Sequence, residues 1–422
     1  MIFNSHHHEA YIWVWLPGAT APVVAGRMTR AGQSLVFNYG RSYLERQDAI
    51  PLYLPELPLR AGRIEPASGL TMAGCLRDGA PDAWGRRLID NLIFGIEGKG
   101  ANHNAVDEFS YLLESGSDRI GALDFQHSPT EYVPRIAKAA TLEALMTSVQ
   151  KVEKGIPLHR EFDQALFHGS SVGGARPKVM IEDGNKKLIA KFPSISDTRN
   201  VVKAEFIAMR LAAIAGLSVA PVRLVQLAGK DVLLIERFDR VKINHGWQRK
   251  LMISALTMFA LDEMVARYAS YADLANIIRH RFTNPKTTLR ELFARLVFNI
   301  ICGNTDDHAR NHAAFFDGSQ LALTPAYDLC PQHRTGNEAS QAMWITADNK
   351  SSTLKACMDT APNFLQDRHE AKSIIEHLLE IVRTELDLLC EEADLAEVDR
   401  RLLQERIFLN PFIFEGSRHI VS

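Results

Sequence analysis

Cysteine is scarce and scattered in this chain. Its 422 residues include five cysteines, and no two of them form a C-x-x-C pair. Structural zinc sites usually draw on such closely spaced pairs, and small secreted proteins usually carry an even set of cysteines for disulfides. We therefore expect reduced thiols, no zinc site and a cytoplasmic location.

Long apolar runs and an excess of one charge are also missing. No stretch approaches the roughly 20 apolar residues of a membrane helix, and the apolar run Ala10–Leu16 has the length of a strand rather than that of a signal peptide. The formal net charge of -2 argues against strong nucleic-acid binding by the chain alone. The hydrophobic content of 46% fits an ordinary globular protein of two or three domains.

The most informative segment is Gly303-Asn-Thr-Asp306-Asp307-His308-Ala-Arg-Asn311, followed by Thr324-Pro-Ala-Tyr-Asp328. Protein kinases place their catalytic base and a magnesium-binding Asn at this Asp-x-x-x-x-Asn spacing, with a further magnesium-binding Asp later in the chain. These residue types suit the chemistry, because the acceptor hydroxyl needs a base and Mg²⁺ prefers hard oxygen ligands. The segment therefore predicts the acidic half of a phosphoryl-transfer site.

A hairpin is expected between the two motifs. His312–Phe316 and Leu321–Thr324 have the pattern of short strands, and Asp317-Gly318-Ser319 suits the turn between them. Such a hairpin would carry Asp328 back beside Asn311.

By itself the acidic segment allows two other interpretations. One is a helix that ends at Gly303 and is followed by a polar surface loop. The other is a metal-dependent hydrolase in which Asp306, Asp307 and His308 are the metal ligands. A hydrolase preforms its metal site from protein side chains, whereas a kinase binds Mg²⁺ largely through ATP. The nucleotide dependence of metal binding would therefore separate the two enzymes.

A glycine-rich loop lies upstream, in Gly169-Ser170-Ser171-Val172-Gly173-Gly174-Ala-Arg176-Pro177-Lys178. It matches neither G-x-x-x-x-G-K-[ST] nor G-x-G-x-x-G, but its glycines allow backbone N–H groups to approach phosphate oxygens. The runs Val179–Ile181 and Lys187–Pro193 flank the turn Asp183–Asn185. They predict a hairpin with the glycine-rich loop at its entrance.

Lys191 ends the second strand of that hairpin, where kinases carry the lysine that contacts ATP. Glu205 lies about one turn into the predicted helix Val201–Gly216 and is placed to pair with Lys191, and Gly216 is expected to cap this helix. The loop, the lysine, the helix glutamate and the acidic motif thus follow one another in the order found in kinases.

Together these motifs resemble the HipA family of bacterial serine/threonine kinases, the toxins of type II toxin–antitoxin pairs that are linked to persistence. The resemblance extends from about Ser170 to Asp328, and a further segment resembles the family's N-terminal domain. The segments that carry it are Ser171–Lys178, Ile189–Pro193, Ile235-Glu236-Arg237-Phe238-Asp239-Arg240, Gly303–Asn311, Thr324–Asp328 and, upstream, Leu76–Arg87.

The resemblance implies a role for each matched residue. Asp306 would be the catalytic base, ATP and Mg²⁺ would be the cofactors, and His308 would either orient the loop or satisfy local backbone carbonyls. The other implied ligands are Asn311 and Asp328 for Mg²⁺, Lys191 for the α- and β-phosphates, Ser171, Val172, Gly173 and Gly174 in the phosphate-binding loop, Glu236 to Phe238 as the hinge that binds adenine, and Asp239 near the ribose.

The resemblance also implies regulation and partners. Ser171 matches a loop serine whose autophosphorylation inactivates family members, and the adjacent Ser170 is a second candidate. A phosphate there would place negative charge where the ATP phosphates must bind. A HipB-like helix-turn-helix antitoxin would bind the chain and tether it to operator DNA, and the prototype's target is an aminoacyl-tRNA synthetase. The loop departs from the prototype at Arg176-Pro177, which replaces Gln-Glu, and Pro177 lacks an N–H donor.

A member of the same family could also have an alternative function without catalysis. A catalytically silent chain would bind nucleotide and act as a corepressor with a DNA-binding antitoxin. The complete set of Lys191, Asp306, Asn311 and Asp328 favours an active kinase over this alternative.

We expect an α+β, protein-kinase-like two-lobed fold with a small N-terminal α/β domain and an all-helical C-lobe. The expected boundaries are residues 1–130 for the N-terminal domain, 131–240 for the nucleotide-binding N-lobe and 241–422 for the catalytic C-lobe. The predicted strands include Gln33–Tyr39 and Ile50–Leu54, and the predicted helices include Ala83–Ile93, Leu142–Val152, Leu289–Ile301 and two amphipathic helices between Glu370 and Ile407.

Overall fold

The computed structural model of the chain divides into two compact units. Unit 1 comprises Met1–Ser196, Val225–Ile253 and Phe316–Ser319, and unit 2 comprises Asp197–Leu224, Ser254–Phe315 and Gln320–Ser422. This division does not test the boundaries expected at residues 130 and 240, which stay predictions. The structure describes residues 7–97, 106–136, 140–158, 166, 169, 174–333, 336 and 338–417.

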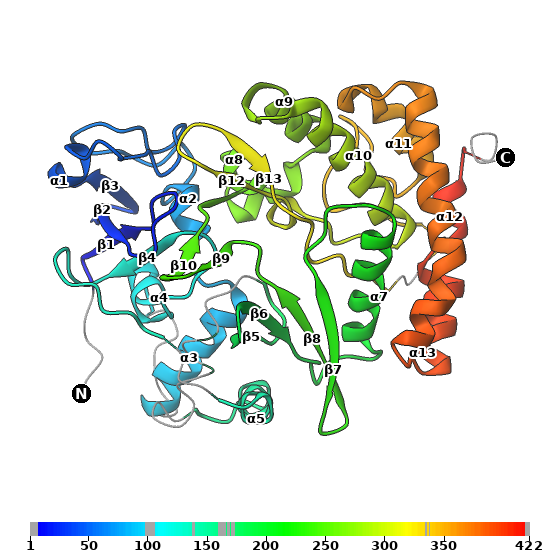
Figure 1. The fold of residues 1–422 in the computed structure, drawn as a ribbon, viewed down its shortest axis with the longest axis horizontal. Coiled ribbons are helices and arrows are strands. Elements are labelled where there is room, and N and C mark those ends of the chain that lie inside the picture. The colour runs from blue at the N-terminus through cyan, green and yellow to red at the C-terminus, as the bar shows by residue number, and fades with distance from the viewer. Residues whose placement is uncertain are drawn as a thin grey trace. The chain divides into compact units, whose positions relative to one another are not determined.

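Unit 1 begins with an antiparallel sheet in the order β3 (Ser34–Tyr39), β2 (Val23–Ala31), β1 (Glu9–Val14) and β4 (Leu123–Gln126), shown in Figure 1. The turn between β2 and β3 contains Gly32, whose φ of 61° is the left-handed conformation favoured in two-residue hairpin turns. The predicted strand at Gln33–Tyr39 is confirmed as β3.

The predicted strand Ile50–Leu54 is wrong. This segment contains only an isolated antiparallel bridge between Tyr53 and Leu57. Pro51 and Pro55 explain the difference, because a proline lacks the N–H that a residue inside a strand must donate.

A second sheet in unit 1 has the order β5 (Lys178–Asp183), β6 (Lys186–Lys191), β8 (Lys230–Glu236) and β7 (Val222–Leu227), of which the part from Val225 onward belongs to this unit. β5 and β6 form the predicted hairpin, with Lys178 opposite Lys191 and a turn at Gly184, whose φ is 60°. β9 (Arg240–Ile243) and β10 (Gly246–Arg249) form a separate antiparallel hairpin.

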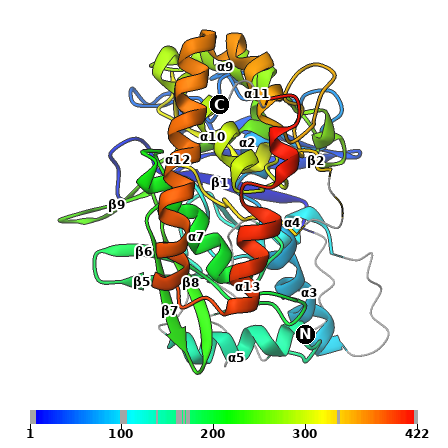
Figure 2. The same ribbon diagram turned by 90° about the vertical axis from the view of Figure 1, so that its right-hand side faces the viewer.

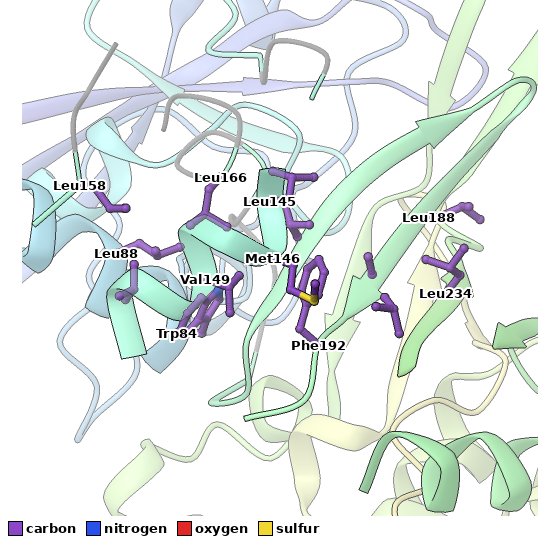
Figure 3. Close-up of a cluster of buried hydrophobic side chains, with 14 residues drawn as sticks. Trp84, Leu88, Leu145, Met146, Val149, Leu158, Leu166, Leu188, Phe192 and Leu234 are labelled. Carbon is purple, nitrogen blue, oxygen red and sulfur yellow. The ribbon is translucent and has the colours of Figure 1, made fainter. Parts of the chain in front are cut away.

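Helices α3 (Ala83–Glu97) and α5 (Leu142–Glu153) pack on one face of the second sheet, as Figure 3 shows. Both helices confirm predictions, and both are longer than predicted. Fully burying a leucine, valine, methionine or phenylalanine side chain stabilises the fold by about 1.5–3 kcal/mol. The shared apolar cluster consists of Trp84, Leu88, Leu145, Met146, Val149, Val152, Leu158, Leu166, Val179, Leu188, Ala190, Phe192, Val232 and Leu234.

Unit 2 is built around α7 (Val201–Ile214), α10 (Pro285–Ile301) and α12 (Arg368–Glu392), and α12 lies beside α7 in Figures 1 and 2. The C-cap of α7 is Ala215, and Gly216 follows it with a φ of 83°. A left-handed glycine just past the end of a helix is the arrangement that the sequence predicted.

α12 begins with a capping box. Asp367 accepts a hydrogen bond from the Glu370 N–H at 2.8 Å, and the Glu370 carboxylate accepts one from the Asp367 N–H at 3.0 Å. The two predicted C-terminal helices are confirmed as α12 and α13 (Glu397–Leu402), and a π-helical turn, Leu403–Ile407, continues α13.

The chain after residue 240 is mainly, though not entirely, helical. It contains the hairpin of β9 and β10, which was not predicted. It also contains the predicted hairpin, formed by β12 (Ala313–Phe316) and β13 (Leu321–Leu323). The remaining elements are α1 (Arg41–Leu44), α2 (Gly74–Arg77), α4 (Glu108–Glu114), β11 (Met252–Ser254), α8 (Ala255–Met258), α9 (Tyr271–Arg281), α11 (Leu354–Thr360) and short 3₁₀ segments at Glu263–Tyr268, Ala309–Asn311, Ala361–Phe364 and Pro411–Phe414.

All five cysteines belong to the described residues, and each is buried and carries a thiol rather than a disulfide. Within the part of the chain that the structure describes, no helix has both the length and the apolar character needed to cross a membrane.

Candidate active site

The end of α10 leads directly into the acidic motif of unit 2. Gly303 has a φ of 70°, and the next residue, Asn304, donates its N–H and its side-chain amide back to Asn299 at 2.8 and 2.9 Å. A Cβ on Gly303 would lie 2.9 Å from the carbonyl oxygen of Ile407. The position therefore needs glycine for both its backbone conformation and its close neighbour.

Gly303→Ala is expected to destabilise unit 2 by roughly 1–3 kcal/mol, because alanine resists the left-handed conformation and collides with Ile407. Gly216→Ala is the matched control, since Gly216 is also left-handed but has no atom within 4 Å of an added Cβ. Thermal unfolding midpoints of both variants provide the measurement. Equal decreases would show that the contact with Ile407 contributes nothing.

The loop after Gly303 brings Asp306 and Asn311 together. The Asn311 side-chain amide donates to the backbone carbonyl of Asp306 at 3.3 Å, and the Asn311 N–H donates to the carbonyl of His308 at 2.8 Å. The Asp306 side chain is exposed, whereas Asn311 is buried. Because the amide nitrogen of Asn311 is used within the loop, its oxygen is the atom that can face a cation.

The hairpin of β12 and β13 returns Asp328 to this loop, as predicted. The Tyr327 hydroxyl donates to the carbonyl of Arg310 at 2.6 Å, and Asp328 has a φ of 59°, which Asp tolerates better than most residues. Although Asp306 is exposed as a residue, partial desolvation of its carboxyl group raises its pKa above the usual value, His308 lowers the pKa, and the charge of Asp328 raises it. Asp306 and Asp328 are therefore close enough to influence each other.

A buried arginine that sequence reasoning missed supports the segment before Asp328. Arg295 of α10 is 3% exposed and donates to the carbonyls of Ser218 and Thr324 at 3.1 and 2.9 Å, while Glu291 binds its Nε at 2.8 Å. The available signal was an arginine among the apolar residues of α10. The Arg295 guanidinium therefore holds the backbone at Thr324, three residues before Tyr327.

Asp307 faces the interior rather than the site. It is 2% exposed, accepts a hydrogen bond from the Tyr271 hydroxyl and lies 3.1 Å from Nε2 of His312. The hydrolase interpretation needed this carboxylate beside Asp306 and His308. Among the described residues, no three His, Cys, Asp or Glu side chains are arranged to hold a metal. Asp307 is therefore not placed to join Asp306 and His308 as a metal ligand.

The Nδ1 atom of His308 is buried and has no hydrogen-bond partner among the described residues. The expectation that the ring satisfies local backbone carbonyls is not met at this atom. Its role in orienting the loop stays a prediction.

In unit 1, Lys191 is buried at the end of β6 and lies directly opposite Lys178 of β5. Opposite residues of antiparallel strands share one face of the sheet, so two lysines stand side by side here. The Lys178 ammonium occupies the space that a Cβ on Gly174 would need. The sequence analysis gave Lys178 no role in the site, although a lysine at the end of the glycine-rich loop was a signal for a phosphate contact.

Only the ends of the glycine-rich loop belong to the described residues. The Gly169 carbonyl accepts a hydrogen bond from the Met180 N–H at 2.6 Å, and the Gly174 N–H donates to the Asp82 carboxylate at 2.5 Å. Phosphate binding by Gly174 stays a prediction, and its N–H is engaged by Asp82 in this structure. The predicted residues that lie outside the described ones are Ser170, Ser171, Val172 and Gly173.

Glu205 is 2% exposed on α7, which belongs to unit 2, whereas Lys191 belongs to unit 1. The ion pair between them stays a prediction.

The predicted hinge begins at the end of β8. Glu236 is paired with Leu188 of β6, and its carboxylate lies 2.5 Å from the Lys186 ammonium. Adenine binding by the backbone of Glu236–Phe238 stays a prediction.

Asp239 lies in a buried ionic network that sequence reasoning missed. It is 2% exposed and accepts hydrogen bonds from Arg237 at 2.8 and 2.9 Å, from Arg240 at 2.9 Å and from the Gly121 N–H at 2.8 Å. Asp118 binds the same two arginines at 3.0 and 2.9 Å. Contact of Asp239 with a ribose stays a prediction, which this burial disfavours.

Comparison with known proteins matches both halves of the chain. A family model for the HipA-like C-terminal domain matches residues 170–386, and one for the HipA N-terminal domain matches residues 14–126. Y4mE of Sinorhizobium fredii is 25% identical over 75% of this chain and 76% of its own length. The serine/threonine-protein kinase toxin HipA of Shewanella oneidensis is 26% identical over 56% of this chain and 59% of its own length.

A solved structure also resembles the chain. It is the Shewanella oneidensis MR-1 toxin–antitoxin complex of HipA, HipB and operator DNA, and its matching chain gives a TM-score of 0.66 at 18% identity, covering 98% of this chain and 96% of that one. This likeness shows the fold, which is α+β and kinase-like as predicted. The model for the HipA-like C-terminal domain alone matches more than half of the residues of this chain, and the chain therefore belongs to the HipA family.

Proposed function

We propose that the chain is a serine/threonine protein kinase that uses ATP and Mg²⁺. The observation that carries the proposal lies within unit 2, where Asn311 donates to the carbonyl of Asp306 and Tyr327, next to Asp328, donates to the carbonyl of Arg310 in the same loop. A base and two metal-binding side chains in one place are what phosphoryl transfer requires. Family membership supports the proposal, since the Shewanella relative is a kinase toxin.

Asn311 and Asp328 fit a magnesium ion. Their amide and carboxylate oxygens are hard ligands of the kind that Mg²⁺ prefers. Two side chains alone do not complete its octahedral shell, so phosphate oxygens of the nucleotide and water would supply the rest. Bound Mg²⁺ would neutralise charge on the phosphoryl group during transfer.

Asp306 would take the proton of the incoming serine or threonine hydroxyl. Its side chain is exposed, so a protein substrate can reach it, and its raised pKa suits a group that must accept a proton. Lys191, and with it Lys178, would contact the phosphates of ATP. Most of the rate enhancement would come from positioning and from these preorganised charges.

The family resemblance supports a wider proposal. The chain would be the toxin of a toxin–antitoxin pair, and autophosphorylation of Ser171 or Ser170 would inactivate it. A HipB-like antitoxin would link it to operator DNA, which is supported by the solved Shewanella complex of HipA, HipB and operator DNA. An aminoacyl-tRNA synthetase as the protein substrate rests on the resemblance alone.

Mass spectrometry tests the central claim. Phosphatase-treated protein incubated with ATP and Mg²⁺ is expected to gain a phosphate on Ser171 or Ser170, and Ser171→Ala and Ser170→Ala identify the position. Asp328→Asn is expected to abolish the gain, because Asn tolerates the left-handed φ of this position but carries no charge. A wild-type chain that binds ATP without any gain would favour the catalytically silent corepressor.

A further inference from the structure

The chain just after the glycine-rich loop is held by a helix from much earlier in the sequence. The Gly174 N–H donates to the Asp82 carboxylate at 2.5 Å, and the Gly174 carbonyl accepts a hydrogen bond from the Trp84 N–H at 3.1 Å. Asp82 and Trp84 stand at the start of α3, and Asp82 precedes Gly174 by 92 residues. Both peptide groups of Gly174 are therefore fixed by one end of this helix.

A third hydrogen bond extends the contact to the start of β5. The indole N–H of Trp84 donates to the Lys178 carbonyl at 3.0 Å. The Trp84 ring is 1% exposed within the apolar cluster of Figure 3, so close packing sets its orientation and that of the bond. We call Asp82 and Trp84, with their three bonds to Gly174 and Lys178, the α3 clamp.

A positive charge lies beside the α3 clamp. Gly174 has a φ of 103°, and the Lys178 ammonium fills the space beside it that any side chain would need. Lys178 in turn lies opposite Lys191 in the β5–β6 pair. A shift of Gly174 would therefore change where the Lys178 ammonium lies relative to Lys191.

We propose that Asp82 and Trp84 are positioning residues for nucleotide binding, which fix the backbone at Gly174 and Lys178 so that the Lys178 ammonium lies where it can contact the ATP phosphates. The inference rests on the kinase function proposed above. Without the α3 clamp, the nucleotide itself must order this segment when it binds, and that ordering cost lowers affinity. The clamp acts on ATP binding and leaves the chemistry at Asp306 unchanged.

The initial rate of radiolabel transfer from ATP to the full chain, measured over a range of ATP concentrations, separates these two effects. Asp82→Ala removes a charge-assisted hydrogen bond and is expected to raise the KM for ATP about tenfold, equivalent to about 1.4 kcal/mol, with kcat within about twofold of wild type. Asp82→Asn keeps an oxygen acceptor for the Gly174 N–H, so it should restore most of the affinity. Trp84→Phe keeps a ring in the cluster and loses only the indole bond, for an increase of about threefold.

Asp107→Ala is the matched control for losing a carboxylate at the start of a helix in unit 1. Asp107 caps α4 by accepting from the Ser110 N–H at 2.9 Å and pairs with Arg30 at 2.8 Å. Its loss is expected to lower the thermal midpoint without changing the KM for ATP. General destabilisation of unit 1 is thereby separated from a specific effect on the nucleotide.

Hydrogen exchange at the amides of residues 174–176 and 178, measured without nucleotide, gives a readout that does not depend on catalysis. Faster exchange in Asp82→Ala than in Asp107→Ala supports the α3 clamp, and equal exchange contradicts it. If Asp82→Ala does not fold, Trp84→Phe carries both measurements.

The outcomes separate this inference from the proposed function. An active wild-type chain with an unchanged KM in Asp82→Ala, or an increase that Asp107→Ala reproduces, would overturn the α3 clamp alone. A wild-type chain that neither binds ATP nor transfers phosphate would overturn the kinase function, and the clamp's role in nucleotide binding with it.

Discussion

Asp306→Asn is expected to slow phosphoryl transfer by roughly 10²- to 10⁴-fold while ATP binding stays close to wild type. An amide has the shape of the carboxylate but cannot take the proton of the acceptor hydroxyl. The loop itself should survive the change, because Asn311 binds the backbone carbonyl of Asp306 and not its side chain. The loss should therefore appear in kcat rather than in folding.

Transfer of radiolabel from ATP to the chain, together with equilibrium binding of ATP, provides the measurement. Asp359→Asn is the control, since Asp359 is an exposed carboxylate of unit 2 that pairs with Lys355 on α11. It should transfer phosphate at the wild-type rate. A wild-type rate in Asp306→Asn as well would remove this residue from the role of base.

Asp239→Ala is expected to reduce the stability of unit 1 by roughly 3–5 kcal/mol. The change leaves Arg237 and Arg240 buried with only Asp118 to share between them from this network. It also removes the acceptor of the Gly121 N–H. Removing one partner of a buried ion pair is costly because the remaining charge stays out of water.

The size of this effect should depend on pH. Burial alone would raise the pKa of Asp239, but Arg237 and Arg240 outweigh burial and hold the pKa below its usual value of about 3.9. A carboxylate whose pKa is lower in the folded state stabilises the fold fully above the unfolded value, and the stabilisation is lost as the pH falls through the folded value. The difference between wild type and Asp239→Ala should therefore be largest near neutral pH and shrink below about pH 4.

Thermal unfolding followed by calorimetry at several pH values tests both statements. Glu45→Ala is the control, because Glu45 forms an exposed ion pair with Arg41 whose loss should cost less than about 1 kcal/mol. An Asp239→Ala variant of normal stability whose defect is a higher KM for ATP would contradict the structural role. It would instead support the predicted contact with the ribose.

Local sequence patterns were sufficient for the elements that carry the candidate site. The hairpin of β5 and β6 followed from two strand-like runs around Gly184, and that of β12 and β13 from the turn Asp317–Ser319. Both depend on neighbours in the chain, which is why they could be predicted. The strand expected at Ile50–Leu54 failed for an equally local reason, the two prolines in and beside it.

The sequence by itself therefore determined the family, the order of the motifs and the spacing of Asp306, Asn311 and Asp328. Only the tertiary structure decided which way each carboxylate faces. Asp306 is exposed, whereas its neighbour Asp307 is buried against Tyr271 and His312. Spacing cannot separate two adjacent identical residues, because their difference arises from segments that pack around them.

The same holds for the contacts between distant segments. The Asp82 carboxylate binds the N–H of Gly174, 92 residues later in the chain. Asp118 and Asp239 are linked because both carboxylates bind Arg237 and Arg240. Such bonds form where burial makes an unpaired charge or peptide group costly, and burial is a property of the assembled fold. Turns and spacings are encoded by neighbouring residues, but the partners of a buried carboxylate exist only once remote parts of the chain have packed together.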